Sequence, residues 1–341
     1  MTVSRIPTFP RTTAVATSIL IAVMLGGAFV LATGGDPFAV FREIVTGSLA
    51  GNNLAHSLSR AVPLVGMALV VALPLRAGLV NLGGDGQLLF GALTAAVVAI
   101  YIPAPGVVRI ILAVMAAVLA GGAYAALAAV LQTALKVPFL IGTLLLSYIG
   151  MGITSYLVRF PLRDTSSGLP ETVRIASDAR LPSALFDLPV GAGFVLMALV
   201  VFLVVVNDGR GVIGFDMRMR GLNPEFARYS GVDLSHQTIA LAATSGAIAG
   251  LVGALLVLGE QYRFTDGAIL AANYTWSGLL AAILATASPL ATVVAAIFFA
   301  ALQVGGFSME RTLGLPNVLT QILQALIILC LAMRGGFARR Q

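Results

Sequence analysis

Charged side chains are scarce in this chain of 341 residues, where Asp, Glu, Lys and Arg together account for 10% of the sequence. A soluble globular domain carries about 25%, so that class of protein is excluded. Hydrophobic residues reach 59%, and the mean hydropathy is +0.99. This balance is typical of helices that pack together within a lipid bilayer.

Catalytic and metal-binding signatures are also missing. Cys330 is the only cysteine, which excludes an internal disulfide and a cysteine-based metal site. His56 and His236 fall in loops expected on opposite sides of the membrane, so neither a metal pair nor a histidine-based triad is expected. No Gly-rich phosphate loop of the Walker type occurs. Basic residues at helix ends account for the net charge of +6, and no nucleic acid is expected as a partner.

The long apolar runs predict an all-α polytopic membrane protein with about ten transmembrane helices. We expect residues 1–341 to form a single transmembrane domain. In chain order its parts are a first helix (12–33), a first helical half (59–158), an external loop (159–189), a cytoplasmic loop (207–236) and a second helical half (237–333). For the first helix a cleaved signal peptide is the alternative, although the apolar core exceeds the usual length of about 7–15 residues.

Two local features of the second half are predicted as well. Residues 237–259 are rich in Gly, Ala and Ser, a composition that permits close helix packing. A polar turn is expected at Gly305–Pro316, between the last two apolar runs.

The basic residues at both ends of the chain predict the orientation. Both termini are short and basic, so both are expected in the cytoplasm, with an even number of crossings. This threading places Arg76, Lys136 and the 207–236 loop inside and the 159–189 loop outside. The protein is therefore expected to be a multi-pass protein of the cell (inner) membrane.

Gly214–Val232 is a charged island between two apolar runs. Asn223 is a favourable N-cap, and Pro224 suits the first helical position because its missing N–H is not needed there. Gly231 can close the segment in a left-handed conformation. The sequence therefore predicts a short helix over about Pro224–Ser230.

The same short helix carries charges and aromatics at informative places. Glu225 lies in its first turn and Arg228 in its last, which suits the helix dipole. Phe226 and Tyr229 are three residues apart, so they share a face that a solvated loop would not need. A partner for this face is one interpretation; an ordinary solvated loop whose helix caps itself is the other.

The pattern Arg-x-x-Gly-x-Asn-Pro-Glu-x-Ala-Arg-Tyr-x-Gly, read from Arg218 to Gly231, resembles the cytoplasmic coupling loop of ABC-importer permeases. The similarity is closest to the nucleoside and simple-sugar branch, related to ribose and branched-chain amino-acid permeases. It implies that the short helix docks on a separate ATPase subunit, which would hold the ATP and Mg, with no cofactor in this chain. The coupling residues that it implies are Gly221, Asn223, Pro224, Glu225, Phe226, Arg228, Tyr229 and Gly231.

Gly78–Gln87 places polar residues and glycines against an apolar run. It resembles the family segment Asn-Ile-Gly-x-Glu-Gly-Gln, with Leu82 for Ile and Asp85 for Glu. Irregular backbone at membrane depth must be buried in protein or line a wet cavity. A broken helix beside the solute path is therefore one interpretation, and a plain cytoplasmic turn is the other.

Two further segments resemble the family. Pro138–Tyr148 matches its Thr-Leu-x-Leu-x-Tyr core but has Pro138, Phe139 and Ser147 where Asn, Glu and Asn are usual. Ala271–Gly278 is similar to the segment ending in Phe-Asp-Gly, with the only tryptophan of the chain at the Phe position. An interfacial belt tryptophan is the alternative there. The residues expected to contact the solute are Asn81, Asp85, Gln87, Ser147, Tyr148, Tyr274 and Trp276.

The resemblance also implies the wider assembly. It predicts an inverted repeat with broken helices, a second permease that is not identical to this one, and an extracytoplasmic solute-binding protein or lipoprotein. The solute is expected to be small and polar, a nucleoside or a simple sugar. An ion-coupled secondary transporter is the rival class, although Asp85 is its only candidate for an ionisable residue near a span. A membrane-anchored enzyme is a more distant alternative.

Overall fold

The computed structural model describes residues 11–32, 34–50, 53–182, 191–316, 318–322 and 324–326. The described residues form helices, with a single isolated β-bridge between Glu171 and Thr265, which confirms the all-α fold. By length and composition, seven described helices could cross a membrane, so the expected number of about ten is not confirmed. They are Asn53–Arg76 (α3), Gly84–Tyr101 (α4), Gly106–Leu135 (α5), Phe139–Arg159 (α6), Ala192–Arg210 (α7), Leu234–Gln261 (α10, Leu234–Leu256, with the π-helical η2, Val257–Gln261) and Pro289–Leu313 (α12).

The chain divides into two compact units, one formed by residues 1–57 with 299–341 and the other by residues 58–298. In the first unit, α1 (Arg11–Ala32) occupies the place of the expected first helix, and α2 (Pro37–Leu49) follows it. Asp36 caps α2 by accepting a hydrogen bond from the Phe38 N–H at 2.9 Å. One buried cluster of described residues in this unit contains Val30, Val40, Ile44, Met309 and Leu319.

The polar turn predicted at Gly305–Pro316 is wrong, because α12 continues through it to Leu313. Gly305 faces the backbone of α2, and a Cβ atom at this position would lie 2.2 Å from the carbonyl oxygen of Ile44. The glycine therefore permits close packing of two helices and does not end the helix.

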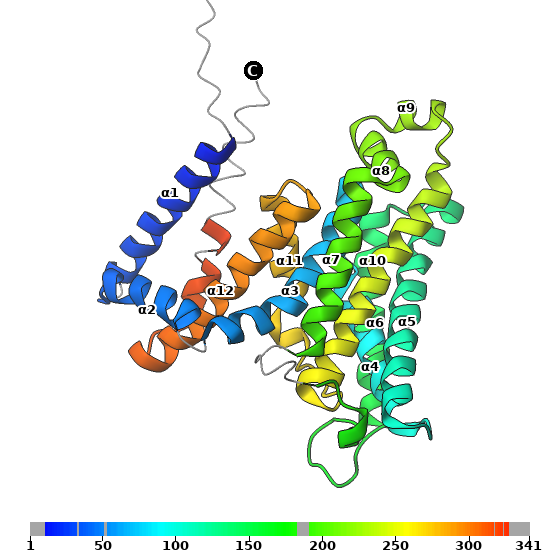
Figure 1. Ribbon diagram of the computed structural model, residues 1–341, viewed down its shortest axis with the longest axis horizontal. Coiled ribbons are helices and arrows are strands. Elements are labelled where there is room, and N and C mark those ends of the chain that lie inside the picture. Colours follow the sequence, from blue (N-terminus) through cyan, green and yellow to red (C-terminus); the bar gives the residue numbers. More distant parts are fainter. Residues whose placement is uncertain are drawn as a thin grey trace, which may run out of the picture. The chain divides into compact units, whose positions relative to one another are not determined.

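In the second unit, α10 packs directly against α4 and α5, and α6 lies against α4 (Figure 1). Glycine makes these contacts close: a Cβ atom at Gly250 would lie 2.1 Å from the Ala117 carbonyl oxygen, and one at Gly246 would lie 2.3 Å from that of Gly121. Gly246 and Gly250 are four residues apart, which puts both on the same helix face. The predicted close packing of 237–259 is thus confirmed.

Charged residues mark the two ends of this second unit. At one end, Arg76 at the end of α3 pairs with Asp208 of α7 at 3.1 Å, and Arg218 of α8 (Val212–Leu222) also binds Asp208. The short helix α9 (Pro224–Tyr229) follows α8 at this end, and the segment 160–182 lies at the opposite end (Figure 1). The sequence predicts this separation of the two loops; residues 183–190 of the expected external loop lie outside the described part.

Candidate functional site

The backbone between α3 and α4 is irregular and buried, and Asn81 organises it. Its side chain has no exposed surface. Its Nδ2 donates to the Gln87 Oε1 at 3.1 Å and to the Ser245 Oγ at 2.8 Å, and its Oδ1 accepts from the Gly83 N–H at 2.8 Å. Ser245 in turn donates to the carbonyl oxygen of Val70 at 2.6 Å. Asn81 therefore ties α3, α4 and α10 together in a fully satisfied polar network.

Two side chains of α6 accept hydrogen bonds from backbone N–H groups around the start of α4. The Thr143 hydroxyl oxygen accepts from the Leu82 N–H at 3.2 Å, and that of Ser147 accepts from the Gly86 N–H at 3.1 Å. These side chains satisfy donors that the start of a helix leaves unpaired. The backbone between α3 and α4 is thus bonded to side chains of α6.

A cavity of about 240 Å³ lies beside this segment. Its walls come from the start of α4, the middle of α6, the 3₁₀ helix η3 (Leu270–Ala272) and the short helix α11 (Tyr274–Leu284). The lining residues are Leu82, Asp85, Leu144, Ser147, Tyr148, Met151, Leu270, Asn273, Thr275, Trp276 and Leu279.

The structure brings four of the seven sequence-predicted solute residues to this cavity: Asp85, Ser147, Tyr148 and Trp276. The other three do not line it. Asn81 and Gln87 lie between the helices and bond to each other, and Tyr274 is buried at 5% exposure.

Sequence reasoning missed Asn273 and Thr275 as polar lining residues. Asn273 adopts a left-handed conformation, with φ at 51°, and α11 begins directly after it. With the helix starting there, positions 275, 276 and 279 share one face. The helical period, applied from this start, would have separated lining residues from buried Tyr274; the sequence signal for the start is weak because Asn273 makes no side-chain cap.

Asp85 is the only charged residue among the described lining residues. It lies in the first turn of α4, where a carboxylate suits the helix dipole, and its Oδ1 accepts a hydrogen bond from the Thr275 hydroxyl at 2.5 Å. This bond joins the beginnings of two helices across the cavity.

Aromatic rings complete the cavity wall. Tyr148 and Trp276 both line the cavity and are not buried by the rest of the chain, with exposed fractions of 62% and 51%. A few hydrogen-bonding groups among leucine, methionine and aromatic side chains are typical of small-molecule sites.

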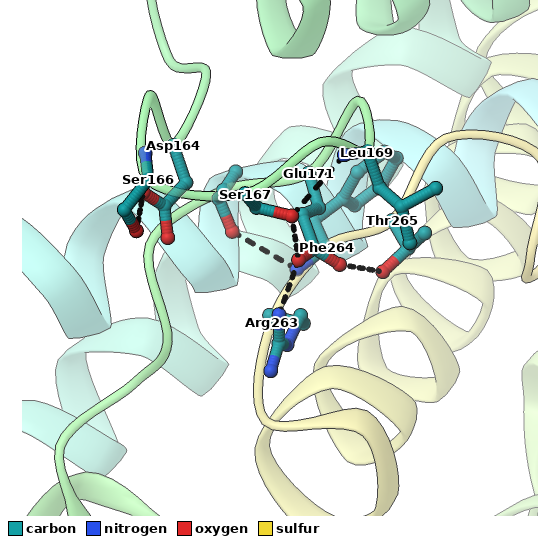
Figure 2. A network of polar contacts seen from close by, with 9 residues as sticks. Asp164, Ser166, Ser167, Leu169, Glu171, Arg263, Phe264 and Thr265 are labelled. Atoms are coloured by element: carbon teal, nitrogen blue, oxygen red, sulfur yellow. Dashed lines mark hydrogen bonds and ion pairs between the residues drawn. The ribbon is translucent and has the colours of Figure 1, made fainter.

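The segment that leads into the cavity wall is anchored to the segment 160–182 (Figure 2). Buried Glu171 binds Arg263 and accepts from the Ser167 hydroxyl at 2.7 Å. Backbone bonds join Thr172 N–H to the Phe264 carbonyl oxygen at 2.9 Å and extend the pairing beyond the single bridge. These contacts fix residues 262–266, from which the chain continues to the cavity at residue 270.

Two ion pairs join residues 262–266 and the segment 160–182 to the neighbouring helices. Arg159 binds Asp266 at 2.8 Å, and Arg109 binds Asp178 at 2.7 Å. The pKa of exposed Asp164 is lowered, chiefly by the hydroxyl of Ser166 and then by its N–H. The segment is therefore structured and charged rather than an open connector.

The short helix at the other end has the predicted caps. Asn223 Oδ1 accepts from the Phe226 N–H at 3.0 Å, Pro224 occupies the first turn, and Gly231 has φ at +93°. The helix ends at Tyr229, one residue before the expected end.

The aromatic face of this helix is uncovered within the described chain. Phe226 is 59% exposed and Tyr229 is 91% exposed, whereas Ala227 is fully buried against the protein. Glu225 and Arg228 are exposed beside them. The surface formed by Glu225, Phe226, Arg228 and Tyr229 is called the α9 face below.

Gly221, near the end of α8, lies close to the backbone at the end of α3. A Cβ atom here would lie 2.2 Å from the Arg76 carbonyl oxygen. Only glycine lets α8 approach the end of α3 so closely.

Comparison with known proteins shows similarity along most of the chain. The family model described as "branched-chain amino acid transport system / permease component" matches residues 53–332. A glucose ABC transporter permease protein of Haloferax volcanii is 33% identical over 333 residues, covering 94% of this chain and 87% of the relative. A guanosine ABC transporter permease protein of Bacillus subtilis is 28% identical, covering 92% of both chains. A nucleoside ABC transporter permease protein of Lactococcus lactis is 25% identical, covering 93% of this chain and 89% of the relative.

Proposed function

The chain belongs to the family of permease components of branched-chain amino acid transport systems, and from this membership we propose that it forms the path by which an ABC importer takes up nucleosides or simple sugars. In this proposal the chain supplies no catalysis. ATP and Mg bind to a separate ATPase subunit, which contacts the α9 face.

The observation that carries the coupling role is the α9 face itself. A six-residue helix caps itself at both ends and still exposes most of Phe226 and Tyr229. Aromatic residues and arginine are enriched among the residues that anchor protein–protein interfaces, and polar residues surround them at the rim. An ATPase subunit that fits this surface would bury both rings.

The cavity supports the solute class. It offers one carboxylate, the hydroxyls of Ser147 and Thr275, and the rings of Tyr148 and Trp276. Nucleosides and sugars need hydrogen bonds and a stacking surface rather than a buried counter-charge. The relatives named for glucose, guanosine and nucleosides point to the same class.

The remaining partners follow from the same role. We propose a second, non-identical permease and an extracytoplasmic solute-binding protein or lipoprotein, which would approach the segment 160–182. The α9 face and both termini would then be cytoplasmic, in a multi-pass protein of the cell membrane.

Thiol labelling tests the docking surface and the direction together. After replacement of the native Cys330 by serine, a cysteine at exposed Gly168 should react with an impermeant thiol reagent in intact cells, and Ser230→Cys should not. In inside-out vesicles Ser230→Cys should react when the ATPase is absent and be protected when it is bound.

Gly168→Cys serves as the matched control in these vesicles, where it should stay unreactive with or without the ATPase. Labelling of Ser230→Cys in intact cells would overturn the orientation. Equal labelling of Ser230→Cys with and without bound ATPase would overturn the docking surface.

A further inference from the structure

Arg220 of α8 lies at the junction between the α9 face and the helix bundle. Its side chain is buried, with 7% of the residue exposed. One guanidinium nitrogen, Nη1, donates to the Leu234 carbonyl oxygen at 3.0 Å and to the Gln237 Oε1 at 3.3 Å. The other, Nη2, donates to the Thr238 hydroxyl oxygen at 2.8 Å. All three acceptors belong to the first turns of α10.

The chemistry of this contact is unusual for a residue that only fills space. Within the described part of the chain no carboxylate forms an ion pair with Arg220, whereas its neighbour Arg218 pairs with Asp208. Burial lowers the pKa of Arg220, because a charge is costly to remove from water. An apolar side chain of similar volume would be less costly here. What the guanidinium adds is a rigid fork that fixes α8 in one orientation on α10.

On the other side of Arg220, α8 and α9 are closely joined. Only Asn223 separates α8 from α9. Gly221 holds the end of α8 against the Arg76 carbonyl oxygen. A partner that displaces α9 would therefore displace α8, which Arg220 joins to α10 by hydrogen bonds.

Along α10 the contact continues to the cavity. Ser245 lies seven residues beyond Thr238, about 10 Å along the helix axis. It accepts the hydrogen bond from Asn81, which holds the backbone of the segment from which Asp85 reaches the cavity. A shift of α10 along its axis thus reaches the cavity wall through one buried network.

We propose that Arg220 is a positioning residue for coupling: it converts movement of the docked α9 face into movement of α10, which reaches the cavity through Ser245 and Asn81. This inference rests on the proposed function, because it needs an ATPase at the α9 face. Coupling is measured directly, as solute uptake per ATP hydrolysed.

The test uses the complete complex, with ATPase, second permease and binding protein, in proteoliposomes. ATP hydrolysis and solute uptake are measured in the same vesicles, with guanosine, uridine and glucose as probes. Arg220→Lys keeps the charge but loses the planar guanidinium, whose two Nη atoms donate to different acceptors. We expect it to assemble and hydrolyse ATP within about twofold of wild type, while uptake per ATP falls about tenfold, within the usual range of site–site coupling.

Arg210→Lys is the matched control, since Arg210 is exposed at the end of α7, and its uptake per ATP should equal that of wild type. Unchanged uptake per ATP in Arg220→Lys would overturn the inference. So would a parallel loss of hydrolysis and uptake, because that pattern is expected of a residue that only stabilises the fold. If Arg220→Lys does not assemble, Thr238→Val removes the Nη2 acceptor instead, and an unchanged ratio there also overturns the inference.

A double-mutant cycle tests whether Arg220 and Ser245 act on the same route from the α9 face to the cavity. Ser245→Ala removes the acceptor of Asn81 on α10 and should lower uptake per ATP by roughly threefold to tenfold. If both residues act on one route, the double variant should be no worse than the poorer single variant. Additive effects would overturn the route.

If the proposed function is wrong, the uptake measurements on the variants give a different result. In that case Glu225→Lys on the α9 face leaves uptake intact. Loss of uptake in Glu225→Lys, together with wild-type uptake per ATP in Arg220→Lys, overturns the Arg220 inference alone.

Discussion

Permease carrying Glu225→Lys or Gly221→Trp is expected to lose both transport and stimulation of the ATPase, while the external binding protein still binds its solute. Glu225→Lys reverses a charge beside the two exposed rings of the α9 face. Gly221→Trp places a side chain where even a Cβ atom would lie 2.2 Å from the Arg76 backbone, so α8 and α9 must move. Interface hot spots of this kind contribute about 2–4 kcal/mol, which predicts a loss of ATPase affinity of roughly 30- to 1,000-fold.

The measurement is co-purification of the ATPase with the permease, followed by uptake in reconstituted vesicles. Gly209→Trp is the matched control, because no atom lies within 4 Å of a Cβ at this exposed helix position. It should behave like wild type. Wild-type uptake in both Glu225→Lys and Gly221→Trp would contradict the assignment of the coupling surface.

Substitution of Asp85 and Trp276 is expected to slow transport more than it weakens apparent affinity, because the external binding protein sets the affinity. Trp276→Ala removes half-exposed stacking surface, which predicts a rate loss of roughly fivefold to tenfold. Asp85→Asn keeps an oxygen for the Thr275 hydroxyl and should cost less than about threefold. Asp85→Leu leaves that hydroxyl unpaired and should cost about tenfold or more.

Initial rates and half-saturation concentrations for guanosine, uridine and glucose check this order. Thr292→Val is a suitable control, since the Thr292 hydroxyl bonds to the Ser288 carbonyl oxygen within its own helix at 2.8 Å. An Asp85→Asn variant as damaged as Asp85→Leu would contradict the view that geometry, rather than charge, matters at this position.

Local rules predicted the α9 helix correctly because its determinants lie within the helix and its immediate flanks. The Asn223 cap, Pro224 and the left-handed Gly231 depend on neighbouring residues alone. Hydrophobic runs likewise predicted the all-α fold, because a bilayer imposes the same requirement on every span.

The roles of several residues depend on tertiary contacts, which the sequence alone does not reveal. Asn81 and Gln87 have the polarity expected of solute ligands, but their amides bond to each other between helices. Gly305 was interpreted as a turn residue, although its role is to let α12 approach α2. Arg220 has no local signal that would distinguish it from the other basic residues at helix ends.

An apolar run need not form a full span, and one of the described runs is too short to cross a bilayer. The run after Trp276 forms α11, which has 11 residues and is about 16 Å long at 1.5 Å per residue. The hydrocarbon core of a bilayer is about 30 Å thick. α11 begins beside the cavity, and the apolar pattern does not reveal this start.

In the proposed function, transport through this chain is driven by ATP hydrolysed in a separate subunit. Uptake of guanosine, uridine and glucose into proteoliposomes tests this, with both permeases and the ATPase in the vesicles, the binding protein outside and ATP supplied to the ATPase. We predict uptake of at least one probe that requires ATP and the ATPase and does not change with an imposed proton or sodium gradient. Uptake that follows such a gradient in vesicles without the ATPase, and that is lost in Asp85→Asn, would contradict the account and establish an ion-coupled transporter.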